Sequence, residues 1–178
     1  FAGISYFFYV YTTPAEIVAY VGTDNAYTIV FILAFIGGLA NFSGIPYHLV
    51  LVTFALGGVN PFLLGTATAI GVMLGDSTSY FLGHLGGKVL SRHLQSFSQM
   101  VHGFGNKHPR VLPLIFFFFA ALTPFSNDFI VFTMGAVRYP FWGVIIPLTL
   151  GNLVFNISLA YFATTAYALF AQVLSVDL

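Results

Sequence analysis

The chain of 178 residues is 58% hydrophobic and only 6% charged, whereas about 25% of the residues in a soluble domain carry a charge. Five basic residues balance five acidic ones, so the net charge is zero and no basic surface is available for a nucleic-acid backbone. These values exclude a nucleic-acid-binding protein and predict an all-α integral membrane protein. At about 20 residues per span, the chain has room for roughly four to six crossings in a single membrane domain, residues 1–178.

The N-terminal part contains two predicted helices. Residues 1–12 are aromatic but too short to span a bilayer alone, so we expect an interfacial segment or the tail of a truncated helix. The sequence Thr13-Pro14-Ala15-Glu16 has the form of a capping box and predicts a short helix that ends near Gly22. A second helix, about residues 25–40, is apolar enough for a short span and ends before residues 41–44.

The next two elements have different predicted relations to the bilayer. Residues 45–58 are apolar but only about 14 residues long, and Pro46 stands at their start, so we interpret them as one arm of a re-entrant hairpin. After Asn60-Pro61, residues 62–86 are long enough for a helix that crosses the bilayer, and they carry Asp76 near their centre.

The segment 88–110 contains four of the five basic residues and three of the five histidines. By the positive-inside rule it lies on the cytoplasmic side, and we expect a prokaryotic cytoplasmic membrane. The histidines at 93, 102 and 108 lack metal-ligand spacing and are expected to face the interface. The apolar residues recur at helical spacing, which predicts an amphipathic interfacial helix with one apolar stripe: Leu90, Leu94, Phe97, Val101 and Phe104.

The C-terminal part repeats the pattern of a broken segment followed by a long one. Residues 111–137 are apolar, but residues 123–128 interrupt the helix in the middle. Irregular backbone at membrane depth is tolerated only where protein or a water-filled cavity shelters it, which predicts a second inward-pointing hairpin. After Arg138-Tyr139-Pro140, residues 141–174 are long enough for one tilted or kinked span or for two short ones.

The two halves of the chain resemble each other. This predicts two copies of a hairpin followed by a span, about residues 25–87 and 111–174, joined by the segment 88–110. An odd number of crossings per copy would make the repeats inverted, as we expect, with a transport site at their interface near the midplane. Prolines, glycines and polar residues recur at offsets of 78 to 80: Pro46 with Pro124, Gly57 with Gly135, Pro61 with Pro140, Gly71 with Gly151, and Asp76 with Asn156. The first pair, Pro46 and Pro124, is expected to break the two hairpins.

Asp76 is a candidate functional residue because a charged group inside a bilayer costs several kcal/mol. Tyr80 and His84 follow at helical spacing, so the three side chains share one face, which suits a proton relay or a site for a cationic group. The alternative role is structural, with Asp76 hydrogen-bonded to a neighbouring helix while nearby glycines allow close packing.

Four further polar residues are candidates for a substrate path. Asn127 and Asp128 lie at the tip of the second hairpin, where Asp128 could instead cap the next helix. His48 lies at the tip of the first hairpin, where a packing role is the alternative. Arg138 either snorkels to the headgroups or binds lipid phosphate. We expect no metal site, no cofactor and no enzymatic activity, because the sequence has no phosphate loop, nucleophile elbow or zinc-protease motif.

The run from Gly71 to Gly87, GVMLGDSTSYFLGHLGG, is similar to the G-x-x-x-G-D-x-x-x-Y-x-x-G-x-x-x-G signature of the DedA family, also called the SNARE-associated Golgi or VTT-domain superfamily. Pro46-Tyr47-His48 resembles the family's P-x-E hairpin, and residues 124–141 resemble its second hairpin, so that the likeness covers about residues 25–165. It implies two inward-facing re-entrant hairpins and a role in lipid handling. Bacterial members are implicated in moving polyprenyl phosphate carriers with the proton gradient, and autophagy-related relatives are phospholipid scramblases.

The chain departs from the family pattern at three charged positions. The hairpin glutamate is His48 here, and the two arginines typical of the second hairpin are Ala121 and Asn127. The tip of the second hairpin, residues 124–128, resembles the scramblase branch, whose loop is poorer in arginine.

Three hypotheses follow for the function. The first is lipid translocation, as a phospholipid scramblase or polyprenyl-phosphate flippase, with membrane lipids and also protons as candidate partners. The path would be a polar furrow between the hairpins, lined by His48, Asn127 and Asp128, with Asp76 and Tyr80 beside it. The second is a proton- or cation-coupled transporter of a small solute, with Asp76 and Asp128 as the titrating pair and His48 as their partner. The third is a non-transporting assembly factor that acts through the segment 88–110.

Overall fold

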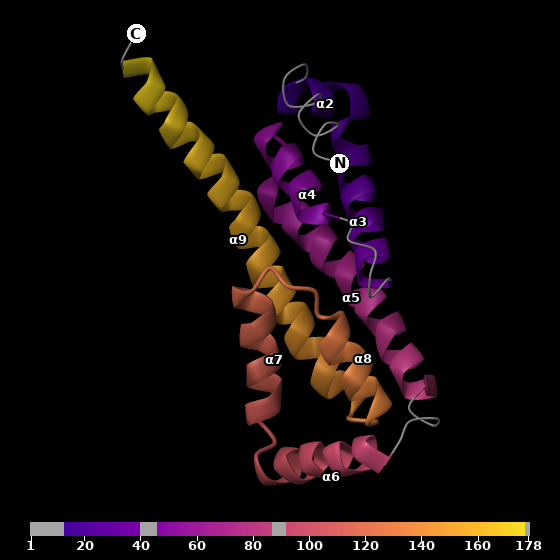
Figure 1. Cartoon of the computed structure of the whole chain (residues 1–178). Helices are drawn as coiled ribbons and strands as arrows, with labels where there is room; N and C mark the ends of the chain where they lie inside the picture. The colour runs from indigo at the N-terminus through magenta and orange to yellow at the C-terminus, as the bar shows by residue number, and fades with distance from the viewer. Residues whose placement is uncertain (1–12, 40–45, 87–91, 177–178) are drawn as a thin grey trace.

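The computed structural model describes residues 13–39, 46–86 and 92–176 (Figure 1). These residues form α-helices and no β-strand, which confirms the predicted all-α class for the described part of the chain. The predicted interfacial segment 1–12 and the stripe residue Leu90 lie outside the described residues. In chain order the described helices are α2 (Pro14–Val21), α3 (Thr23–Leu39), α4 (Tyr47–Leu56), α5 (Pro61–Gly86), α6 (Arg92–Lys107), α7 (Val111–Leu122), α8 (Asp128–Ala136) and α9 (Phe141–Val176).

Helix α2 begins with the predicted capping box. The backbone N–H of Glu16 donates to Thr13 Oγ1 at 3.3 Å, and the backbone N–H of Thr13 donates to Glu16 Oε2 at 2.8 Å. Gly22, with a φ of 86°, ends α2, and α3 starts at the next residue. The chain bends by 98° between the two helices, so α2 lies across the end of α3 (Figure 1).

Helix α9 is one helix of 36 residues that continues through Pro147, so residues 141–174 are a single element and not two short spans. Among the described helices, its stretch Phe141–Leu169 is long and apolar enough to cross a membrane, and α2 with α3 meets the same criterion as a bent pair. Helix α5 has 26 residues, about 39 Å at 1.5 Å per residue, but it is less apolar because it carries Asp76 and several hydroxyl side chains.

The two longest helices, α5 and α9, pack against each other in antiparallel orientation (Figure 1). Early in α5, Gly65 touches the backbone of Ile157, and late in α5 the ring of Phe81 stacks on Phe141, with 5.3 Å between the centroids. Helix α3 packs along α5 and α7 along α9, whereas α4 contacts α9 and α8 contacts α5. Each short helix after a break therefore packs on the long helix of the other half of the chain.

Glycines let the outer helices approach the central pair. A Cβ at Gly71 would lie 2.5 Å from the carbonyl oxygen of Phe31 in α3. Gly151 occupies the corresponding place in α9, where its Cα faces the carbonyl oxygen of Phe117 in α7. Small residues at such crossings allow the close backbone contact that is typical of helix packing in membranes.

The turns that end α4 and α8 have the same hydrogen-bond pattern. In each turn one residue has a left-handed backbone, Gly58 at φ 91° and Arg138 at φ 59°. Its N–H donates to the carbonyl three residues earlier, and the N–H of the following residue, Val59 or Tyr139, donates to the carbonyl five residues earlier. The two turns lie 80 residues apart in the sequence.

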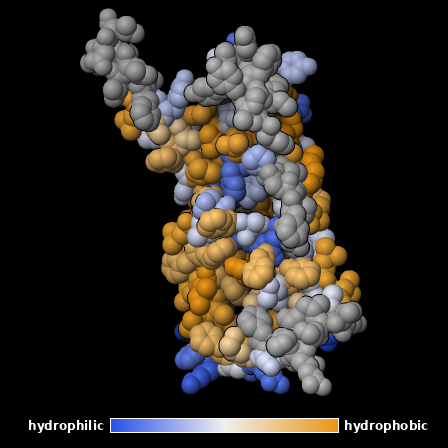
Figure 2. Space-filling model, viewed as in Figure 1, coloured by the Kyte–Doolittle hydropathy of each residue, from blue (hydrophilic) through white to orange (hydrophobic). Residues whose placement is uncertain are grey.

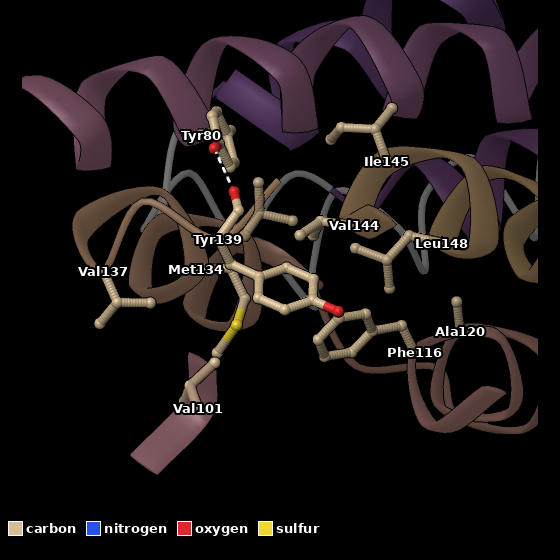
Figure 3. Packing of buried hydrophobic residues seen from close by; sticks show 11 residues of the cluster. Tyr80, Val101, Phe116, Ala120, Met134, Val137, Tyr139, Val144, Ile145 and Leu148 are labelled. Atoms are coloured by element: carbon tan, nitrogen blue, oxygen red, sulfur yellow. Dashed lines mark hydrogen bonds between the residues drawn. The ribbon is translucent and has the colours of Figure 1, made fainter. Parts of the chain in front are cut away.

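The buried apolar residues form two clusters, one toward each end of the molecule. The first cluster lies between α5, α6, α7, α8 and α9, and Figure 3 shows how the ring of Tyr139 packs among its aliphatic members and Phe116. The second cluster lies between α2, α3, α4, α5 and α9, around Leu51 and Leu64. In Figure 2, hydrophilic residues are visible at mid-height between hydrophobic bands.

Helix α6 lies across one end of the molecule and packs on the first apolar cluster (Figure 1). Of the predicted stripe, Val101 is buried in that cluster, whereas Phe104 is 40% exposed. The side chains of Leu94 and Phe97 lie outside the described part. The apolar stripe was predicted to face the membrane interface along its whole length. At Val101 it faces the protein interior instead.

Candidate functional site

The site is centred on Asp76, in the interior of α5. Asp76 is only 2% exposed. It follows Gly75, whose Cα lies against the backbone of Gly38 in α3, so the two helices touch at this level. One turn further along α5, the Ser79 hydroxyl donates to the carbonyl oxygen of Gly38 at 2.9 Å. This contact fixes the register of α3 on α5 beside the carboxyl group.

The break between α7 and α8 brings a second group of polar side chains to Asp76. Helix α7 ends at Leu122 and α8 begins at Asp128, so the predicted interruption, which contains Pro124, is confirmed over residues 123–127. The Asn127 side-chain amide donates to Asp76 Oδ2 at 3.2 Å. The structural alternative for Asp76 was a hydrogen bond to a neighbouring helix. Asp76 does bind another part of the chain, but its partner Asn127 lies in the break before α8 and not within a helix.

Asp128 is held by Ser126 at the start of α8. The Ser126 hydroxyl donates to Asp128 Oδ2 at 2.5 Å, and the backbone N–H of Asp128 donates to Ser126 Oγ at 3.3 Å. The Ser79 side chain lies beside the same carboxyl group. The N-cap residue of α8 is Asn127, which makes no side-chain capping bond. Asp128 is therefore the first residue of α8 and not its N-cap, which was its alternative role.

This cluster contains more hydrogen-bond acceptors than donors. Asn127 and Asp128 are 4% and 6% exposed, and within the described residues Asn127 Oδ1 and Asp128 Oδ1 are buried without a hydrogen-bond partner. Leaving such an atom unpaired costs about 1–3 kcal/mol, so a partner from outside the chain would be favourable. The sequences of α3, α4, α5, α7, α8 and α9 contain no lysine or arginine that could neutralise the two carboxyl groups.

The start of α4 supplies aromatic residues near this cluster. The ring of Tyr47 packs on Gly37 of α3, next to the Gly38 carbonyl that receives the Ser79 hydroxyl. His48 is half-buried, and its ring lies against that of Tyr47 at a tilt of 34°, with ring centroids 4.0 Å apart. It also meets Phe155 of α9 edge to face at 5.5 Å. The structure thus places His48 against α9, whereas Asp76 belongs to the other long helix, α5.

Tyr80 and His84 lie on the same side of α5 as Asp76 but have different surroundings. The Tyr80 hydroxyl donates to the backbone carbonyl of Tyr139 (Figure 3). The ring of His84 stacks on Tyr80 at 6.3 Å, and His84 Nδ1 is buried without a partner in the described part. Tyr80 therefore anchors the turn between α8 and α9, and its hydroxyl is bonded to that turn.

Arg138 is exposed in that turn, ten residues beyond Asp128 along the chain. The carbonyl before it, that of Val137, receives two bonds from α6: the Ser98 hydroxyl at 3.2 Å and His102 Nε2 at 3.0 Å. His102 was predicted to face the interface, and this is wrong because its ring binds the protein. Arg138 itself is not part of the cluster around Asp76.

Several residues of the interior were not predicted as site residues. Ser79 and Ser126 hold the cluster together, and two amides of α9, Asn152 and Asn156, are buried. The sequence marks Ser79 and Asn152 by their polarity within apolar helices, Ser126 by its place in the break, and Asn156 also by its repeat match to Asp76. Small hydroxyl residues are common in membrane helices, where they bond to their own backbone, so this signal is weak.

The fold and this interior define a helical membrane protein with a buried polar site at a break between helices. The model of the VTT domain matches residues 45–165, about two thirds of the chain and all of α4 to α8. The chain belongs to the VTT domain family, the domain of the DedA and SNARE-associated membrane proteins, as the resemblance implied. No curated protein and no solved structure matches the chain.

Proposed function

We propose that this protein translocates lipid headgroups across the bilayer along the polar interior between the starts of α4 and α8. The observation that carries the proposal is the cluster of Asp76, Asn127 and Asp128, which is buried, lies at a helix break and retains unpartnered oxygen atoms. A lipid headgroup cannot enter hydrocarbon without replacing the hydrogen bonds that it loses from water. Polar side chains at membrane depth provide such replacements, and because their burial is costly they are candidates for a function.

The arrangement of helices supports two inverted repeats as the frame of this path. The hairpins would be α3 with α4 and α7 with α8, and each is followed by a long helix, α5 or α9. The long helices are antiparallel, the turns that precede them have one hydrogen-bond pattern, and Gly71 and Gly151 make corresponding contacts. In transporters built from inverted repeats, the site lies where broken helices meet near the midplane.

The substrate would be a phospholipid or a polyprenyl phosphate, moved without covalent chemistry and without a cofactor. Uncoupled exchange needs only a lower barrier for the headgroup, and the cluster can provide this with few charges. The prediction that α6 lies on the cytoplasmic side of a prokaryotic cytoplasmic membrane belongs to the same proposal.

A second candidate function is favoured by the pair of carboxyl groups. Asp76 and Asp128 lie close enough for their charges to interact, and no basic residue of their helices pairs with them. Such a pair could carry a proton or a cation with a small solute. This alternative predicts transport that stops when the ion gradient is removed, whereas scrambling continues without a gradient.

The proposal is tested by phospholipid exchange in proteoliposomes, with a fluorophore on the acyl chain and an impermeant quencher outside. We compare the wild type, Asp128→Asn, Asn127→Leu and empty vesicles. Asp24→Asn is the matched control because Asp24 is an exposed carboxylate in the first turn of α3. We expect fast exchange with the wild type and the control, and slower exchange with the two site variants. Wild-type vesicles that exchange no faster than empty ones would refute the proposal.

A further inference from the structure

Helix α9 carries two buried amides that the path described above does not include. Asn152 is 6% exposed and Asn156 is fully buried. They continue a stripe of buried residues at four-residue spacing, with Leu148 before them and Ala160 after them. The interruption of this apolar stripe by two amides is costly in a membrane protein unless the amides are paired.

The two amides are only partly satisfied by the protein. The Asn156 side-chain amide donates to the backbone carbonyl of Asn152 at 2.8 Å. Within the described residues, Asn156 Oδ1 and Asn152 Nδ2 are buried without a partner. The pair therefore offers one free acceptor and one free donor to a group that enters from outside, and it carries no charge.

The position of the pair follows from the contacts between α5 and α9. Asn156 is next to Ile157, which touches Gly65, and Asp76 lies eleven residues beyond Gly65. At 1.5 Å per residue, Asn156 and Asp76 are about 15 Å apart along the helix pair. The hydrocarbon core is about 30 Å thick, so it has room for both groups, one toward each leaflet.

The start of α4 lies beside the amide pair just as the start of α8 lies beside Asp76. His48 contacts Phe155, the residue before Asn156, whereas Asn127 binds Asp76. Asn156 also follows Asp76 by 80 residues, the same separation as that of the two turns. Asn156 and Asp76 thus occupy corresponding positions in the two halves of the chain, but Asp76 binds the opposite hairpin whereas Asn156 bonds its own helix.

We propose that Asn152 and Asn156 form a second polar half-site, toward the opposite leaflet from the half-site of Asp76, Asn127 and Asp128. The inference rests on the proposed function. The first half-site presents acceptor oxygens, which suit the hydrogen-bond donors of a headgroup. The second is a neutral donor and acceptor pair, which suits a phosphodiester oxygen together with a hydroxyl or amine hydrogen. A headgroup would exchange the contacts of one half-site for those of the other near the midplane.

The absence of cysteine from the chain makes a direct test possible. Single cysteines are introduced as Asn156→Cys, Asn127→Cys and Leu148→Cys, and the proteoliposomes are treated with a membrane-impermeant methanethiosulfonate. Leu148 is the control because it is fully buried in the same stripe as Asn156. We expect cysteine 156 to react from one side of the membrane, cysteine 127 from the other, and cysteine 148 from neither. A cysteine at 156 that is as unreactive as that at 148, or that reacts from the same side as 127, overturns the inference.

The exchange assay then separates this inference from the proposed function. With Asn156→Leu, which keeps the size of the side chain but removes the amide, we expect lipid exchange to slow about tenfold, the effect of one lost hydrogen bond in the rate-limiting passage. Asn156→Gln restores the donor and acceptor and should recover part of the rate. Full activity of Asn156→Leu overturns the inference but leaves the proposed function intact. If the wild type fails to exchange lipid, the proposed function fails. The reactivity of the cysteines at 156 and 127 then tests by itself whether the second half-site exists.

Discussion

The close contact between α3 and α5 predicts that Gly75→Ala destabilises the protein. The new Cβ would lie 2.6 Å from the Cα and carbonyl carbon of Gly38 and 2.7 Å from the carbonyl oxygen of Phe35. These are backbone atoms, which cannot rotate away, so the helices must separate by about 1 Å to reach normal contact. Overpacking of this kind costs about 1–3 kcal/mol and outweighs the gain of up to about 1 kcal/mol from alanine in a helix. The Ser79 bond to the Gly38 carbonyl, now 2.9 Å, would be lost as well.

Gly103→Ala is the matched control. Gly103 also lies within a helix, α6, but a Cβ there would have no atom within 4 Å. Alanine should stabilise this position by about 0.5–1 kcal/mol. Thermal unfolding of the purified proteins in detergent, followed by circular dichroism, measures both effects. We expect the midpoint of Gly75→Ala to fall by about 2–8 °C and that of Gly103→Ala to stay or rise. A midpoint of Gly75→Ala at or above that of the wild type would refute the reasoning.

Two further predictions concern the turn between α8 and α9. Tyr80→Phe leaves the buried carbonyl of Tyr139 without its donor, so the free energy of unfolding should fall by about 1–3 kcal/mol; an unchanged unfolding midpoint would show that this bond contributes nothing. The double variant Ser98→Ala, His102→Leu removes both bonds of α6 to the Val137 carbonyl, so the backbone amides of α6 should exchange with deuterium faster while those of α5 keep their rates. Equal exchange rates in α6 of the variant and the wild type would contradict that prediction.

Local signals explain why the helices and their breaks could be predicted from the sequence. The capping box at Thr13 and Glu16, the left-handed Gly22 and the proline at 124 each act within one or two turns of backbone. The same holds for the break between α7 and α8, because polar residues and a proline interrupt an apolar segment there. The polar character of Asp76, Asn127 and Asp128 was sufficient to select them as candidates.

The contacts between distant residues could not be predicted in the same way. Asn127 binds Asp76 across 51 residues, and Tyr80 binds the Tyr139 carbonyl across 59. His102 was assigned to the interface because the sequence shows only its place on an amphipathic helix. Its partner, the Val137 carbonyl, is available because α8 ends at its C-cap, Val137. Such pairs depend on how whole helices pack, and no local pattern encodes this.

The central claim is that the buried polar interior lets lipid headgroups cross the bilayer. It is tested most directly by the quenching of acyl-labelled phospholipid in wild-type proteoliposomes that have no ion gradient. We expect rapid loss of fluorescence from both leaflets, and slower loss with Asp128→Asn and with Asn156→Leu. Quenching confined to the outer leaflet, as in protein-free vesicles, would contradict it.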